Sequence, residues 1–135
     1  MTYKIEDIEG IGEVYGSKLR AKDIATTDAL LNIAGTKKGR ISLAENTGLP
    51  ESLILTWVNH ADLMRINGVG SQFAELLEAA GVDTVKEFAT RNADNLHAKM
   101  IETNETNGLA GSVPSVNMLK DMIEQAKNLT PMISH

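Results

Sequence analysis

The chain has no cysteine and few aromatic residues, and both shortages narrow what it can be. Without cysteine there is no disulfide, thiolate zinc site, iron–sulfur cluster or cysteine nucleophile. Aromatic residues are 4% of the 135 positions and hydrophobic residues 42%, so the core must be built mainly from Leu, Ile, Val, Ala and Met. This length suits one domain, or two small units that share a core.

Long apolar runs are also missing. The longest are a few residues, whereas a helix that spans a bilayer needs about 20. The first nine residues contain three carboxylates and no apolar run follows them, which is not the pattern of a signal peptide. We therefore expect a cytoplasmic protein that makes no membrane contact.

The balance of charge is acidic, with a net charge of −5 and a pI of about 5.1. Proteins that coat nucleic acid are usually basic, so this balance argues against broad nucleic-acid coating but not against a small local contact. Residues 1–61 carry seven Lys/Arg and eight Asp/Glu, a net −1, and residues 62–135 carry six and ten, a net −4. The first half is thus the better candidate for holding a phosphate with cations.

One segment of the chain occurs twice. Residues 8–19 and 66–77, which lie 58 positions apart, share two glycines, the apolar residue between them, an aromatic residue and a later leucine. A second block, residues 53–61, matches residues 118–126 at a separation of 65. The seven additional residues fall around 104–111, which is rich in Asn, Gly and Thr and is typical of a loop.

No Pro-rich or Ser-rich linker separates the two copies. We therefore predict two repeats, residues 1–61 and 62–135, packed together as one globular unit.

Every strong apolar period is helical. Apolar residues at i, i+1, i+4, i+5 and i+8, as in 53–61, lie on one face of a helix, and no stretch alternates as a strand does. We predict an all-α fold with about five short helices in each repeat. Glycines that stop helices and residues that cap them agree with this: Gly48 and Gly81 as stops; Thr36, Asn92, Thr26 or Thr27, and Asp83 or Thr84 as N-caps.

The two Gly-apolar-Gly segments are the most specific signal, and each has the pattern of a helix-hairpin-helix. A short helix that ends at Ile8 precedes the first turn, and residues 63–66 lead into the second. A second helix follows at about 13–22 or 71–80. The first glycine can adopt a positive φ, the apolar residue fills the gap between the helices, and the second glycine permits close approach at the next helix. The amides and dipole of that helix start can hold a phosphate.

Acidic residues oppose a phosphate at both turns, because Glu9 and Glu13 flank the first and Glu75 and Glu78 follow the second. Each turn can therefore also serve only to pack two helices. The dense basic run at 37–40 is interpreted first as a solvated helix start and second as another phosphate contact. The candidate nucleic-acid-binding residues are Gly10, Ile11, Gly12, Lys18, Lys22, Lys37, Lys38, Arg40, Gly68, Val69, Gly70, Ser71 and Gln72.

No arrangement typical of catalysis or of metal binding is present. His60, His97 and His135 are isolated, so no helical metal pair exists, and no serine has the context of a nucleophile. His60 is expected to be a polar helix-end residue, and Trp57 on an apolar face is expected to be core. We expect no enzyme activity, no metal and no cofactor.

The runs 8–12, 48–66, 68–70 and 75–89, followed by 95–100 and 113–115, resemble a bacterial family known only as a domain of unknown function with tandem helix-hairpin-helix units. The resemblance implies two fused repeats in a SAM-like helical bundle, akin to the N-terminal domains of recombinases, and supplies no activity. Known helix-hairpin-helix proteins grip the DNA backbone without reading bases, and the resemblance implies the same possibility here. The usual hairpin pattern has Ala at the position of Gly16, and the second copy has Ala74 at the matching position.

Two functions are therefore predicted. The first is a non-enzymatic module that contacts double-stranded DNA backbone weakly and without sequence preference. The alternative is a protein–protein adaptor in which the hairpins are architecture and the acidic surface meets a basic partner. The sequence does not fix the oligomeric state. Whether the two turns share one face decides whether a grip across a DNA groove is feasible.

Overall fold

The computed structural model describes residues 2–135, and within them it is all helical, as predicted. The backbone forms no sheet in this range, and its one β-type pairing is an isolated bridge between Lys4 and Thr26. The elements are η1 (Ile5–Asp7, a 3-10 helix), α1 (Gly12–Arg20), α2 (Thr27–Ala34), α3 (Lys37–Thr47), α4 (Glu51–Leu63), α5 (Ser71–Ala79), α6 (Val85–Phe88), α7 (Ala93–Asn107) and α8 (Val116–Asn128).

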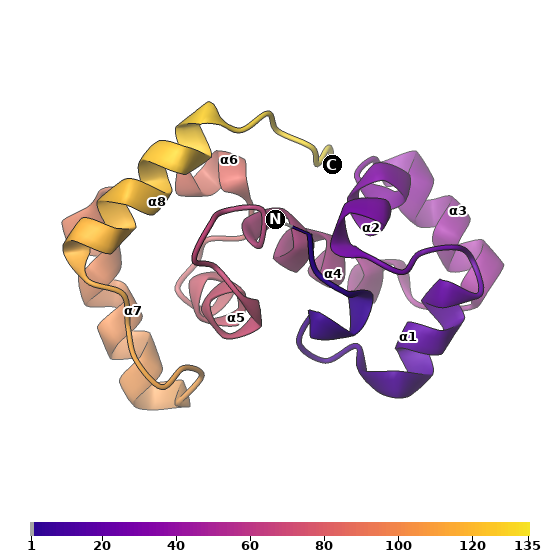
Figure 1. The fold of residues 1–135 in the computed structure, drawn as a ribbon, viewed down its shortest axis with the longest axis horizontal. Coiled ribbons are helices and arrows are strands. Elements are labelled where there is room, and N and C mark those ends of the chain that lie inside the picture. The colour runs from indigo at the N-terminus through magenta and orange to yellow at the C-terminus, as the bar shows by residue number, and fades with distance from the viewer. Residues whose placement is uncertain (1) are drawn as a thin grey trace.

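The helices form two groups with α4 between them (Figure 1). The first group comprises η1 and α1 to α3, and the second comprises α5 to α8. Helix α4 packs on α2 and α3 of the first group and on α5 of the second. After α8 the chain runs back toward α2, so both ends of the second group are connected to the first (Figure 1).

One continuous hydrophobic cluster extends through both groups. It consists almost wholly of aliphatic side chains and methionines, as the low aromatic content predicts. The largest member is Trp57 on α4, which is 1% exposed and packs against the ring of Tyr15 with centroids 5.2 Å apart. The prediction that Trp57 belongs to the core is confirmed.

The helix ends follow the predicted capping signals. A side-chain oxygen of each N-cap residue accepts a hydrogen bond from the amide three residues on, which satisfies one of the free amides of the helix start. These N-caps are Thr26, Thr36, Thr84 and Asn92. Gly48 follows α3 with a φ of 73° and Gly81 follows α5 with a φ of 96°, a left-handed conformation that glycine adopts without strain.

One predicted boundary is wrong. Helix α7 continues through Asn107, well into the segment 104–111 that was expected to be a loop. The hydroxyls of Thr103 and Thr106 donate to the carbonyl oxygens four residues back, so these polar residues are satisfied inside the helix until Gly108 ends it at a φ of 60°. Helix α4 ends at Leu63, so α4 is the helix that leads into the second turn.

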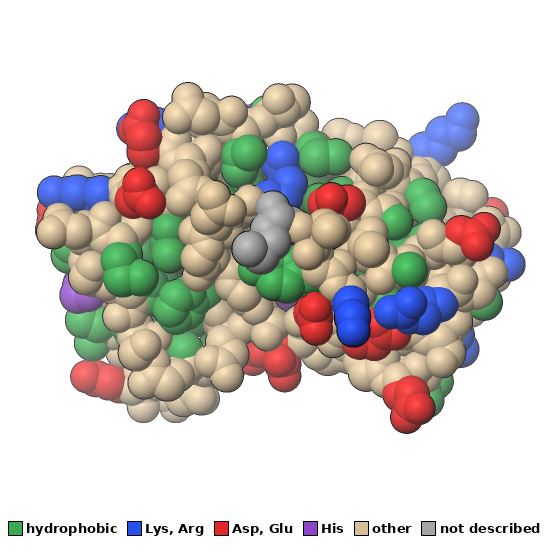
Figure 2. All heavy atoms as spheres, viewed as in Figure 1, with side chains coloured by type: hydrophobic (Ala, Val, Ile, Leu, Met, Phe, Trp, Pro, Cys, Tyr) green, Lys and Arg blue, Asp and Glu red, His purple; other side chains and the backbone are tan. Residues whose placement is uncertain are grey.

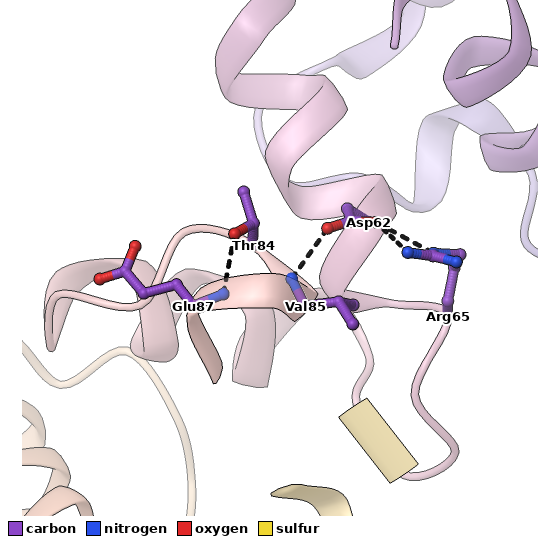
Figure 3. A network of polar contacts seen from close by, with 5 residues as sticks. All are labelled: Asp62, Arg65, Thr84, Val85 and Glu87. Carbon is purple, nitrogen blue, oxygen red and sulfur yellow. Dashed lines mark hydrogen bonds and ion pairs between the residues drawn. The ribbon is translucent and has the colours of Figure 1, made fainter. Parts of the chain in front are cut away.

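A buried carboxylate joins the end of α4 to the start of α6 (Figure 3). Asp62 is 2% exposed, and its Oδ1 accepts hydrogen bonds from Nε and Nη2 of Arg65 at 2.9 and 2.6 Å. Its Oδ2 accepts the Val85 amide at 2.8 Å. Since both oxygens are engaged, Asp62 fixes the position of α6 relative to α4.

Between residues 2 and 135, none of the helices has both the length and the apolar character that crossing a bilayer requires.

Candidate binding surface at the two glycine turns

The first glycine and the apolar residue of each turn adopt the predicted geometry. Gly10 has a φ of 87° and Gly68 a φ of 95°, which are left-handed values. The Ile11 amide donates to the Ile8 carbonyl at 3.3 Å, and the Val69 amide donates to the Ile66 carbonyl at 3.1 Å. Ile11 and Val69 are 1% and 0% exposed, so each fills the space inside its turn.

The second glycines of the two turns differ from each other. Gly12 is left-handed, with a φ of 61°, whereas Gly70 has a φ of −97° and a ψ of −167°, which is extended backbone. A Cβ on either glycine would meet no atom of residues 2–135 within 4 Å. No part of residues 2–135 therefore comes as close to these two glycines as was expected.

Both turns border the same surface depression, which has a volume of about 690 Å³. Gly10 and Gly12 line it from the first turn, and Gly70 and Ser71 line it from the second. Helices α1 and α5 begin at these residues, so both helix starts lie at the depression. The two turns thus share one face of the molecule.

A smaller depression of about 340 Å³ adjoins the second turn. It is lined by Gly68, Gly70, Ser71 and Gln72, together with the half-buried ring of Phe73. The structure therefore brings together the candidate residues of the second turn, which has the polar side chains Ser71 and Gln72 at its rim.

The shared depression is acidic. Glu6, Asp7 and Glu9 line it, and no lysine or arginine is among its lining residues. Burial raises the pKa of Glu75 on α5, and the charges of Glu9 and Glu78 raise it further, whereas His60 lowers it. Carboxylates from both turns therefore crowd one region, and this crowding disfavours an anionic ligand.

Glu6 is the one carboxylate of the depression with an arginine partner. Its two oxygens accept hydrogen bonds from Nε and Nη2 of Arg20, both at 2.6 Å, and these bonds lower the pKa of Glu6 to about 2. Gly16 of α1 makes room for this pair, since a Cβ there would lie 2.7 Å from Glu6 Oε2. The glycine that departs from the resembled family's pattern is thus explained by the ion pair beside it.

The predicted lysines lie apart from the shared depression. Lys18, on α1, and Lys22, just beyond α1, are exposed, and Lys22 instead lines a separate hollow of about 260 Å³ against α2 and α3. Lys37 and Lys38 are exposed in the first turn of α3, which agrees with the interpretation of a solvated helix start. The structure does not gather these four cations around the glycine turns.

Arg40 was predicted to be a candidate phosphate contact, and that prediction is wrong. The residue is 2% exposed, and its guanidinium donates to the carbonyl oxygens of Ala34, Gly35 and Ser134 at 3.1, 2.9 and 2.6 Å. Carbonyls at a helix C-terminus have no partner within the helix, and Arg40 supplies one at the end of α2. Its charge therefore holds the fold together instead of facing a ligand.

The other arginines are engaged internally as well. Arg65 binds Asp62, and Arg91 pairs with Glu87 and donates to the Gly81 carbonyl at 2.7 Å. Together with Arg20 and Arg40, these are the only four arginines of the sequence. On the face drawn in Figure 2, the basic and acidic side chains are interspersed and no broad basic patch is visible.

Comparison with known proteins identifies a family. The model of a domain of unknown function, DUF4332, matches residues 9–129. The chain belongs to this family. The match covers both glycine turns and all of α1 to α8. No curated protein and no solved structure matches the chain.

One polar residue of this DUF4332 chain lies deeper than the sequence suggests. His60 was expected to be a polar helix-end residue, and it does lie in the last turn of α4, but it is 3% exposed and its Nε2 lies 2.8 Å from Glu78 Oε2 on α5. Its position next to Ala61 on the apolar α4 was the sequence feature from which its burial could have been predicted. In residues 2–135 no three His, Asp or Glu side chains are placed to hold a metal ion.

Proposed function

We propose that this DUF4332 domain is a non-enzymatic binding module made of two helix-hairpin-helix units, with the shared depression as its binding surface. Hydrogen bonds 58 positions apart support two equivalent units: the Ile24 amide donates to Leu19 O at 3.0 Å, and the Val82 amide donates to Leu77 O at 2.8 Å. Helices α4 and α8, both of 13 residues, also correspond at the separation of 65.

The partner that fits this surface is a protein segment rich in lysine or arginine. The observation that carries this choice is the presence of Asp7 and Glu9 around the depression where both turns meet, beside Glu6, whose charge Arg20 already balances. A cationic side chain beside Glu75 would also relieve the crowding that raises its pKa. Exposed ion pairs contribute about 0.2–1 kcal/mol each, so several are needed and binding should weaken with salt.

Double-stranded DNA is the second candidate, and a different observation favours it. Helices α1 and α5 both start at the depression, and helix starts bind phosphate through free amides and the dipole. The charge distribution opposes this candidate, because all four guanidiniums have partners within the chain and the depression is lined by carboxylates. The basic protein segment therefore ranks first.

Fluorescence anisotropy separates the two candidates. One labelled probe is a short lysine-rich peptide and the other a short DNA duplex, each titrated at about 50 mM and about 200 mM salt. The proposal expects the peptide to bind at low salt and more weakly at high salt. Glu9→Gln should weaken this binding, whereas Glu102→Gln, at an exposed position on α7, should not.

Two results would overturn the choice of partner. The DNA candidate would be established instead if the protein bound the duplex and this binding weakened steeply with salt. Gly70→Glu would also have to abolish the binding while helicity is retained. Flat titrations with both probes at low salt would remove the depression as a charged binding surface altogether.

A further inference from the structure

The segment that follows α8, residues 129–135, lies against the first helix group, and we call it the strap (Figure 1). Two hydrogen bonds of the Ser134 main chain attach it there. The Ser134 amide donates to the Gly35 carbonyl at 2.9 Å, and the Ser134 carbonyl accepts Nη2 of Arg40 at 2.6 Å. The strap thus connects the far end of the second group to the junction of α2 and α3.

The surface under the strap is shaped to hold it. Gly35 follows α2, and a Cβ at this position would lie 2.4 Å from the Met132 carbonyl oxygen, so only glycine leaves room for the strap backbone. Met132 and Ile133 are partly buried against the core. Main-chain bonds, a close glycine contact and apolar packing therefore act on one short stretch.

The buried guanidinium of Arg40 at this contact favours release of the strap. The buried guanidinium has only neutral carbonyl oxygens as hydrogen-bond acceptors, its Nε has no acceptor, and burial lowers its pKa. The charge of Glu51 offsets this only in part, because the pKa of Arg40 is lowered overall. A buried charge that is hydrogen-bonded only to neutral groups is poorly compensated, and water can replace the Ser134 carbonyl once the strap leaves. Departure of the strap would thus hydrate Arg40 and offset part of the cost of the lost contacts.

The two helix groups are otherwise joined mainly through α4. Helix α4 packs on α5, and the Tyr3 hydroxyl donates to the Val69 carbonyl at 3.4 Å. The shared depression is lined by residues 6–10 and Gly12 of the first group and by Gly70 and Ser71 at the start of α5 in the second. Its width therefore depends on how the two groups are held relative to each other.

We propose that the strap is a releasable tie that fixes the angle between the two helix groups and so sets the width of the shared depression. The regulatory part of this inference rests on the proposed function, since it concerns the same surface. When the strap is bound, the two glycine turns are held at one separation. When the strap leaves, the groups move about α4 and the separation varies.

A matched pair of substitutions tests the tie. Ser134→Pro removes the amide that donates to Gly35, whereas Ser134→Ala keeps both main-chain bonds, and the Ser134 side chain is in no hydrogen bond of residues 2–135. Because the chain has no cysteine, spin labels can be placed at Val14→Cys on α1 and Met118→Cys on α8. These positions are 70% and 49% exposed and lie in different groups.

Pulsed electron resonance then measures the distance distribution between the labels. The tie predicts the parent distribution in Ser134→Ala and a broadened, shifted distribution in Ser134→Pro and in a chain that lacks residues 130–135. Circular dichroism verifies that helicity is retained. The inference is overturned if Ser134→Pro and the shortened chain both keep the parent distribution, or if Ser134→Ala shifts as much as Ser134→Pro.

These measurements contain no partner, so their outcome is independent of the peptide titrations. A change in the distribution without peptide binding would leave the tie standing and remove the proposed function. Peptide binding with an unchanged distribution would support the proposed function and remove the tie.

Discussion

Tyr3, which precedes η1, is linked to Val69 of the second glycine turn, because the Tyr3 hydroxyl donates to the Val69 carbonyl across 66 positions of sequence. The distance of 3.4 Å is at the long end for a hydrogen bond, so the link is a weak one. It nevertheless joins the segment before η1 to the middle residue of the second turn. The placement of the turns on one face is thus encoded in a contact between the two copies.

Alanine should have opposite effects at Gly10 and Gly70. Gly10→Ala is expected to lower the free energy of unfolding by about 1–2 kcal/mol, since its left-handed φ of 87° is unfavourable for an L-residue. Gly70→Ala is expected to be neutral or to raise it by up to about 1 kcal/mol, because its φ of −97° suits alanine and nothing lies near the new Cβ. Urea denaturation measures both, and equal losses would contradict the turn geometry.

The Glu6–Arg20 pair should stabilise the fold in a pH-dependent way. The pKa of Glu6 falls from 4.5 to about 2 on folding, so its contribution is complete above pH 4.5 and is lost as the pH falls toward 2. Glu6→Gln should therefore lower the midpoint of thermal unfolding at neutral pH, and its curve should converge with the parent curve in acid. Parallel curves across this range would refute the expectation, and Glu102→Gln is the control.

Gly16→Ala should raise the pKa of Glu6 and leave the stability of the fold nearly unchanged. Alanine is favoured over glycine in a helix by about 1 kcal/mol, but its Cβ would displace the Glu6 carboxylate from its place beside Arg20. We expect little net loss of stability and a Glu6 pKa that returns toward its ordinary value. A carboxyl titration followed by NMR measures the pKa, and an unchanged low value would show that the pair does not need Gly16.

Asp62→Ala should be among the most destabilising substitutions at a buried position. It leaves the guanidinium of Arg65 and the Val85 amide without their partner, and breaking such a buried pair costs about 3–5 kcal/mol. Asp94→Ala, at an exposed position of α7, should change stability by no more than about 0.5 kcal/mol. Similar losses in the two variants would mean that Asp62 does not hold α6.

Glu75→Gln should stabilise the protein at neutral pH. Burial and the neighbouring carboxylates raise the Glu75 pKa, so the folded state binds this proton more tightly than the unfolded chain does. The parent therefore loses stability as the pH rises through the window between the unfolded and the folded pKa, and glutamine removes that loss. Thermal midpoints should differ at neutral pH and converge below pH 4.5. A lower midpoint for Glu75→Gln at neutral pH would contradict the acidic crowding.

The local features of this fold were predictable because they depend on neighbouring residues. Thr26 and Thr84 cap the expected helices, and Ile11 and Val69 fill the turns, since spacing alone places them there. The sequence could not distinguish Gly12 from Gly70, because glycine is compatible with both conformations that the turns adopt.

The features that escaped prediction depend on partners far away in sequence. Arg40 stands in a basic run and so resembles a solvated cation, yet it binds Ser134, 94 positions later. Arg20 likewise follows an exposed pattern but is held by Glu6 of the preceding element. Such pairings decide whether a guanidinium is free to bind a ligand. This is why the prediction for Arg40 was wrong, whereas the predictions for the geometry of the turns, which depend on local sequence, were confirmed at Gly10 and Gly68.

The shared use of α4 has a practical consequence for anyone who wishes to divide or recombine this chain. The predicted boundary between the two repeats, residues 61 and 62, lies inside α4, and Asp62 at that point accepts the amide that starts α6. A fragment that ends at residue 61 would lack the carboxylate, and one that begins at 62 would lack nearly the whole helix against which α5 packs. A transplantable second unit must therefore carry α4 with it, so the cassette that can be exchanged is longer than the sequence that is repeated.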